Sequence, residues 1–352
     1  MKNFSLALTY DDVLLVPQYS EVSSRSQVSL ETNLTKKIRL KFPVTSANMD
    51  TVTNKSMAKS MFKFGGVSFY PRFMTPDQQA NDILELTKQG VFVVPAVGIK
   101  QGELERVKLL LSKCNIKCIL IDVAHGHLKS NLDFVHNIHK LYPEIEIIAG
   151  NIATYEGAKA LFMAGATTVK VGVGPGSICT TRKVTGSGVP QITAISEAYK
   201  AAQEANGYVL ADGGMTSSGD IVKALAAGAS TVMVGNILSG TDEAPGEIIE
   251  KDGKKYKKYN GSTSLEEKKK QVKKFAKGKD KFYTLHVEGV EAYIPYKGPV
   301  LAILQQIEMG IRSGFSYSGA FNIREFHKKA RFVQIISSTQ SRNGAHSVIL
   351  DL

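Results

Sequence analysis

Eight short runs of apolar and β-branched residues recur along the chain, and segments with helical patterning separate them. Unbroken apolar runs are typical of strands buried on both faces, and therefore of a parallel sheet covered by helices. Eight such β/α units predict a closed (β/α)8 TIM barrel from Phe42 to about Gly240, with an open doubly wound sheet as the alternative. The runs are FPVTSANM (42–49), GGVSFY (65–70), VFVVPAV (91–97), CILIDVA (118–124), EIEIIAG (144–150), TTVKVGV (167–173), GYVLADGG (207–214) and STVMVG (230–235).

An internal similarity supports the barrel. MAGATTVKVG, which begins at Met163, and AAGASTVMVG, which begins at Ala226, align without gaps. Each reads as a helix end, a glycine turn and a buried strand, as successive units of a barrel would. The open alternative is less well supported, because VGVGPG lacks the G-x-G-x-x-G spacing of a dinucleotide-binding turn.

The 352 residues could form one large α/β domain or two ordinary ones. With eight β/α units, we expect a single barrel catalytic domain over residues 1–352, located in the cytoplasm. Of the 352 residues, 43% are hydrophobic, yet no apolar run approaches the roughly 18 residues that span a bilayer. The first residues, MKNFSLALTYDDVLL, do not resemble a signal peptide. We therefore expect no membrane partner.

The net charge of +12 is concentrated in one segment. Between Lys251 and Lys281 there are thirteen lysines against four acidic residues, with no arginine. Such a cluster is poor support for nucleic-acid recognition. It predicts a lysine-rich insertion over 251–295, read either as a solvated loop or as a mobile flap that closes over the site.

Polar residues follow the ends of many of these runs, where barrel enzymes place their chemistry. The most informative is VGVGPGSICTT (171–181), in which Cys179 follows three glycines. The neighbouring Arg182 and the loop amides would favour a nucleophilic thiolate, although a buried structural cysteine fits the same pattern. The carbonyls of Gly174, Gly176 and Cys179 are candidate ligands for a monovalent cation such as K⁺.

A phosphate site is expected after the seventh and eighth runs, in the sequences ADGG and VGN. Asp212 is placed to accept hydrogen bonds from sugar hydroxyls, with a helix-capping turn as the alternative. Together with Ser177, the pattern indicates a nucleotide monophosphate whose base reaches Cys179.

The sequence KVGVGPGSICTTRKVTGSGVPQ (170–191) resembles the cysteine-loop signature of IMP dehydrogenases and GMP reductases. The similarity extends over most of the chain, through YDDVLLVPQYSEV, ANMDTVT, IDVAHGH, IIAGNIAT, LADGG, MVGNILSGTDEAPGE and PYKGPV. It implies a (β/α)8 barrel, a homotetramer, and GMP or IMP plus a nicotinamide cofactor as ligands.

In that family a cysteine thiolate adds to C2 of the purine. The resemblance makes Cys179 the nucleophile, Thr181 its hydrogen-bonding partner and Glu288 a proton-transfer residue of the flap. The implied nucleotide-binding residues are Ser177, Asp212, Gly213, Gly214, Gly235, Asn236, Tyr259, Gly261, Ser262, Thr263 and Gly289. The implied cofactor-binding residues are Ser24, Arg25, Asp122, Val123, Ala124, Val173, Gly174, Ser313, Gly314, Phe315 and Ser316.

Four features favour a GMP reductase that uses NADPH. The segment between the second and third runs has no room for the CBS modules common in dehydrogenases. The flap reads Lys281-Phe282-Tyr283, without the arginine of the dehydrogenase's Arg-Tyr pair. Val123-Ala124 replaces the usual hydroxyl residue of dehydrogenases, and Ser24-Arg25 with Asn48 resembles the reductase pattern.

Other segments favour the alternative, an IMP dehydrogenase that uses NAD. They are TYDDVLLVP, TRKVTGSGVPQIT and VEGVEA, together with Pro71-Arg72 where some reductases carry a lysine. A noncatalytic nucleotide-binding barrel is a third possibility.

Overall fold

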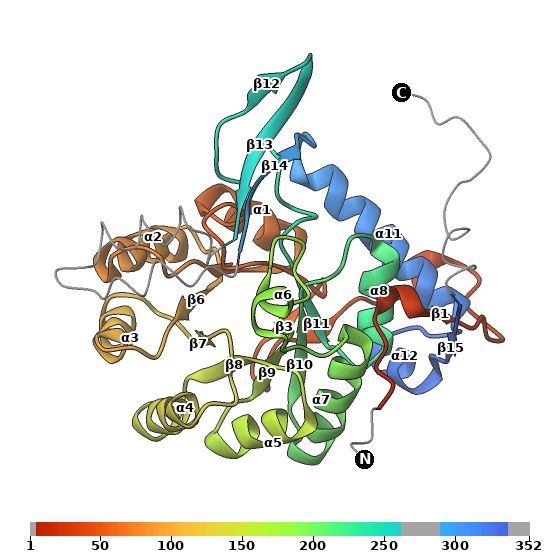
Figure 1. The fold of residues 1–352 in the computed structure, drawn as a ribbon, viewed down its shortest axis with the longest axis horizontal. Coiled ribbons are helices and arrows are strands. Elements are labelled where there is room, and N and C mark those ends of the chain that lie inside the picture. Colours follow the sequence, from red (N-terminus) through yellow and green to blue (C-terminus); the bar gives the residue numbers. More distant parts are fainter. Residues whose placement is uncertain (1–4, 262–288, 337–352) are drawn as a thin grey trace.

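Eight parallel strands close into a barrel in the computed structural model, which describes residues 5–261 and 289–336 (Figure 1). The ring closes where β11 pairs in parallel with β4. The predicted TIM barrel is therefore confirmed, and the open-sheet alternative is wrong. In ring order the strands are β10 (Tyr208–Asp212), β11 (Thr231–Val234), β4 (Val44–Ser46), β5 (Val67–Tyr70), β6 (Val93–Val97), β7 (Cys118–Asp122), β8 (Glu146–Ile152) and β9 (Thr168–Val171).

Helices connect the strands and cover the outside of the barrel (Figure 1). Asn54, Thr75, Thr154 and Ser217 begin four of them by accepting a backbone N–H in the first turn. The helices are α1 (Lys55–Phe64), α2 (Pro76–Lys88), α3 (Glu103–Lys113), α4 (Lys129–Leu141), α5 (Tyr155–Ala164), α6 (Thr181–Thr185), α7 (Gln191–Ala205), α8 (Ser218–Ala226), α11 (Val300–Tyr317) and α12 (Ile323–Lys329). Among the described residues, no helix is long and apolar enough to cross a membrane.

The core has two parts. Side chains that include Val67, Phe69, Leu120 and Met233 fill the barrel, while a larger cluster lies between the strands and the surrounding helices. A filled barrel has no pore, so ligands must bind at its mouth. Between β5 and β6 the chain forms only α2 and short connections.

A three-stranded antiparallel sheet stands away from the barrel at the top of Figure 1. It consists of β12 (Ile249–Lys251), β13 (Lys254–Asn260) and β14 (Glu291–Pro295). The described ends of the predicted 251–295 insertion are thus strands, and a solvated loop is wrong for them. Residues 262–288 of the insertion lie outside the described residues.

Short elements complete the chain. The strands β1 (Val13–Leu15) and β15 (Phe332–Gln334) pair with each other, as do β2 (Thr32–Asn33) and β3 (Arg39–Leu40). The 3-10 helices η1 (Tyr10–Asp12) and η2 (Arg25–Gln27) precede the barrel.

Candidate active site

The loop that carries Cys179 follows β9 and lies against the chain at both edges of the undescribed segment. Cys179 forms an antiparallel bridge with Gly289, and the amide of Val290 donates to the carbonyl of Ile178 at 3.1 Å. A Cβ added to Gly261 would lie 3.2 Å from Cα of Gly289, so these backbones pack closely. The structure thus brings together Cys179, Gly261 and Gly289.

The thiol of Cys179 is half-buried. Its Sγ donates to Oγ1 of Thr181 at 3.2 Å, so the two residues expected to share the chemistry are in contact. Arg182, expected to favour the thiolate, points elsewhere. Its guanidinium donates to the carbonyls of Val173 (3.2 Å) and Val189 (2.7 Å), so it braces the two ends of the loop.

Glycines let this loop lie directly on the turn after β10. Gly172 has φ of +153°, and a Cβ there would lie 2.1 Å from the carbonyl oxygen of Asp212. Gly213 and Gly214 also have positive φ, and a Cβ at either would lie within 3.2 Å of Pro175. The candidate phosphate and nucleophile segments therefore form one continuous surface.

Three hydroxyl and amide side chains meet beside this surface. Nδ2 of Asn236 donates to Oγ of Ser177 at 3.2 Å, and Tyr259 is also hydrogen-bonded to Ser177. A Cβ on Gly235 would lie 3.1 Å from the Tyr259 hydroxyl. Burial raises the pKa of Tyr259 to about 12, so this hydroxyl remains a hydrogen-bond donor at neutral pH. Converging neutral donors of this kind suit an oxyanion such as phosphate.

A buried lysine joins the ends of β7 and β10. Nζ of Lys170 lies 2.9 Å from Oδ1 of Asp122 and 2.6 Å from Oδ2 of Asp212. Asn48 donates to Asp122 at 3.0 Å, and Asn151 donates to Asp212 at 2.9 Å. Asp122, expected to bind the cofactor, and Asp212, expected to bind the ribose, are therefore parts of one network.

The charges of this network stabilise one another. Burial would by itself lower the pKa of the Lys170 ammonium, but Asp122 and Asp212 raise it above its ordinary value. Burial would raise the pKa of the Asp122 carboxyl, but Lys170 and Arg72 hold it below its ordinary range. The lysine stays protonated and Asp122 stays ionised, so these side chains are fixed before any ligand binds.

Lys170 was missed by the sequence analysis. The available signal was a single charged residue inside the apolar run TTVKVGV, which predicts a buried strand. A lysine there needs a carboxylate partner, since an unpaired buried charge is strongly unfavourable.

The predicted cofactor residues fall into two separate groups. Asp122, Val123 and Ala124 end β7 at the barrel mouth, where Val123 exchanges backbone hydrogen bonds with Gly150 and Asn151. Val173 and Gly174 follow β9, the second strand along the ring from β7.

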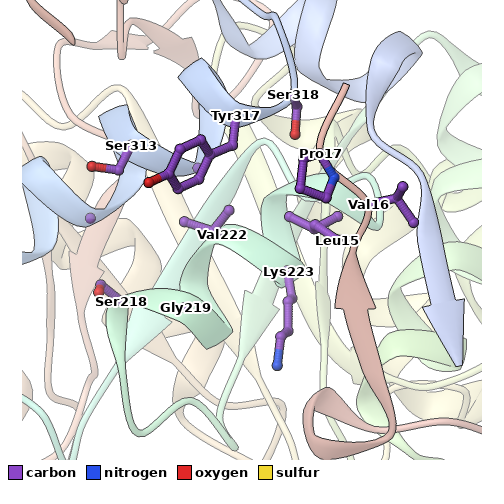
Figure 2. Close-up of a pocket in the computed structure, with 12 residues that line it drawn as sticks. Leu15, Val16, Pro17, Ser218, Gly219, Val222, Lys223, Ser313, Tyr317 and Ser318 are labelled. Atoms are coloured by element: carbon purple, nitrogen blue, oxygen red, sulfur yellow. The ribbon is translucent and has the colours of Figure 1, made fainter. Parts of the chain in front are cut away.

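The second group lies outside the barrel. Ser313, Gly314 and Tyr317 of α11 line a cavity of about 260 Å³ with residues of α8 and 15–17 (Figure 2). The helix α8 leads into β11, and β11 lies opposite β7 in the ring of eight strands. The two groups of predicted cofactor residues therefore lie on opposite sides of the barrel within one chain. Exposed Ser24 and Arg25 accompany this group, since Arg312 of α11 donates to the Arg25 carbonyl at 3.4 Å.

Phe315 differs from its neighbours on α11. Its ring is fully buried and stacks on Phe326 with 4.1 Å between centroids. The ring thus packs in the core, so the predicted cofactor contact of Phe315 stays a prediction that concerns its backbone.

Other predictions concern residues or groups that are not described. Ser262, Thr263 and Glu288 lie outside the described residues. Over the described ranges, no cluster of three His, Cys, Asp or Glu residues could hold a metal ion. A monovalent cation would instead bind the carbonyl oxygens of the loop. The carbonyl oxygen of Gly176 already accepts a hydrogen bond from the Cys179 amide at 3.0 Å, so one of its lone pairs is left for a cation.

Comparison with known proteins identifies the family and the fold. The family described as "IMP dehydrogenase / GMP reductase domain" matches residues 7–346. The inosine-5'-monophosphate dehydrogenase of Nitrosopumilus maritimus is 34% identical, with 99% of each chain covered. The GMP reductase of Leishmania major is 31% identical, with 97% of each chain covered.

A solved structure is also similar. It is a cysteine-to-alanine variant of the GMP reductase of Trypanosoma brucei, crystallised in complex with guanosine 5'-monophosphate. The two chains superpose with a TM-score of 0.91 at 29% identity. The match covers 98% of this chain and 99% of that one.

Proposed function

Because the chain belongs to the family of IMP dehydrogenases and GMP reductases, we propose that it is a GMP reductase, which converts GMP to IMP and ammonia with NADPH. The observation that carries this choice is in the sequence: no arginine occurs between Arg182 and Arg312. The dehydrogenases of the family use a flap arginine to activate water, and this chain has none in the corresponding stretch. Without that base, a covalent intermediate would resist hydrolysis.

In the proposed reaction the Cys179 thiolate adds to C2 of GMP, and the C2–N bond breaks to release ammonia. The hydroxyl of Thr181, 3.2 Å from Sγ, can hold a proton next to C2 for the departing amine. Glu288 would relay that proton, as the resemblance implies. The second step would add a hydride to C2 and break the C–S bond, whose electron pair leaves with sulfur, to yield IMP and the free thiolate.

The nucleotide would lie across the surface between β9, β10 and β11. Ser177, Asn236 and Tyr259 would bind the phosphate with the backbone of Gly214 and Gly235, and Asp212 would bind the ribose. Similarity to a reductase structure crystallised with GMP supports this placement. Gly261, Ser262 and Thr263 would follow the base, and Gly289 would lie beside it.

The cofactor would bind next to the nucleotide, at the barrel mouth. The exposed Ala124 lies where a planar ring could approach, and Gly174 packs so closely on the Arg182 side chain that a Cβ there would lie 2.6 Å from it. NADPH, when bound, supplies the hydride for the second step. The chain's own part is to fix Asp122 through Lys170 and Asn48. A cytoplasmic homotetramer and a K⁺ ion on the cysteine loop complete the proposal.

The second candidate is an IMP dehydrogenase. A dehydrogenase covering 99% of this chain at 34% identity favours it. In that case IMP would lose hydride to NAD and water would release XMP from the same cysteine.

One absorbance assay separates the candidates. We expect oxidation of NADPH with GMP, and little reduction of NAD with IMP. The variant Cys179→Ser should abolish turnover and retain GMP binding, because a serine hydroxyl supplies far less nucleophilic anion. XMP production from IMP and NAD, with no GMP-dependent oxidation of NADPH, would establish the second candidate.

A further inference from the structure

The ammonium group of Lys297 lies against the turn that follows β11. Its Nζ donates to the carbonyl oxygens of Asn236 at 2.6 Å and Ile237 at 3.1 Å. Lys297 itself follows β14, so it fastens the three-stranded sheet to this turn. Over the described ranges no carboxylate forms an ion pair with Lys297, and the ammonium binds peptide oxygens instead.

Asn236 connects this lysine to the expected phosphate residues. Its carbonyl accepts from Lys297 and from Oγ of Ser239, the latter at 2.8 Å. Its side chain donates to Ser177 on the cysteine loop at 3.2 Å. The orientation of the Asn236 backbone therefore determines where its amide group can meet an oxyanion.

We propose that protonated Lys297 is a positioning residue for the nucleotide phosphate, which holds Asn236 in its binding orientation and links nucleotide affinity to pH. This inference rests on the proposed function, because it assumes that a mononucleotide phosphate occupies the site beside Asn236. Lys297 does not need to touch the nucleotide. Its effect passes through two peptide carbonyls.

The protonation state of Lys297 is poised near physiological pH. Burial lowers its pKa to about 8, from an ordinary lysine value near 10.4. Two carboxylates on the adjoining segments are engaged elsewhere: Asp242 accepts the Tyr296 hydroxyl at 2.6 Å, and Glu243 accepts the Val300 amide at 2.8 Å. The charged form of Lys297 is thus lost as pH rises through about 8, and affinity should fall with it.

The remaining titratable neighbours provide the control. Lys257 donates to the carbonyls of Thr241 and Ala244, both at 2.8 Å, farther along the same segment. Burial lowers the pKa of Lys257 as well, but none of its contacts involves Asn236. Tyr259, with its pKa near 12, remains neutral over the range that matters. Lys257→Met therefore removes a similar lysine without touching the phosphate residues.

The test measures binding rather than turnover. Dissociation constants for GMP and for ribose 5-phosphate are measured by calorimetry between pH 7 and 9 for wild type, Lys297→Met, Lys297→Arg and Lys257→Met. Ribose 5-phosphate has no base to titrate, and its phosphate is already dianionic above pH 7. Circular dichroism at each pH confirms that every variant is folded.

For wild type we expect affinity to weaken about tenfold at pH 9, one unit above the pKa. Lys297→Met should bind weakly at all pH values. Lys297→Arg should restore affinity and remove the pH dependence, because arginine stays charged. Lys257→Met should keep the wild-type profile.

Two results would overturn the proposal. Identical pH profiles for wild type and Lys297→Arg, or wild-type affinity of Lys297→Met at pH 7, would show that the proton on Lys297 has no part in binding. A wild-type protein that does not bind GMP at pH 7 would refute the proposed function itself, and the inference with it.

Discussion

The ammonium nitrogen of Lys170 lies 2.6 Å from Oδ2 of Asp212, and the two side chains come from the neighbouring strands β9 and β10. This contact connects the interior of the barrel to the candidate nucleotide site. The Asp212 side chain, expected to bind ribose, is thus held in place by the buried ammonium group of Lys170.

Lys170→Met should destabilise the protein by about 3–5 kcal/mol, because it leaves two carboxylates without their shared buried partner. Lys159→Met is the matched control: Lys159 forms an exposed ion pair with Glu204 at 3.3 Å. Loss of an exposed pair costs less than about 1 kcal/mol. Urea unfolding of the three proteins checks both values, and equal midpoints for the two variants would contradict the role of Lys170.

Asp212→Asn should weaken GMP binding about ten- to a hundredfold, since a neutral amide loses the charge-assisted hydrogen bonds expected with the ribose hydroxyls. The protein should remain folded, because Lys170 keeps Asp122 as a partner at 2.9 Å. Calorimetric titration with GMP measures the effect. Unchanged affinity in the folded variant would remove Asp212 from the nucleotide site.

Gly172→Ala should disrupt the cysteine loop and abolish GMP binding. The new Cβ would lie 2.1 Å from the Asp212 carbonyl, and the backbone has φ of +153°, so either β9 or β10 must move. Gly186→Ala is the control: φ is +70° and nothing lies within 4 Å of the added Cβ. It should cost only about 1–2 kcal/mol for the left-handed backbone and leave binding intact, so equal losses in both variants would contradict the prediction.

Stability should fall at acidic pH through Asp122. Its pKa is lower in the folded protein than in the unfolded chain, so its contribution is complete above about pH 4. That contribution is lost as pH falls through the lower folded-state value. Urea midpoints between pH 6 and 3 should therefore decline more steeply for wild type than for Lys170→Met, which lacks the interaction. Parallel curves would show that another group controls acid unfolding.

The barrel could be predicted from the sequence because strands that are buried on both faces consist of short unbroken apolar runs. Runs such as CILIDVA and STVMVG have no polar alternation, and that pattern fits a parallel sheet inside a shell of helices. The cysteine loop could also be predicted from the sequence, because its glycines and Cys179 lie within one short segment of the chain. The resemblance to a family likewise rests on short contiguous sequence motifs.

The contacts that make the site depend on residues far apart in the chain, and only the tertiary structure decided them. Lys170 meets Asp122 and Asp212 because β7, β9 and β10 converge at one end of a closed ring. Arg182 lies three residues after Cys179 in the sequence, yet its guanidinium binds the carbonyls of the loop ends. Sequence periodicity reports which face of an element is buried, but the direction of a long polar side chain depends on the partners that the fold supplies.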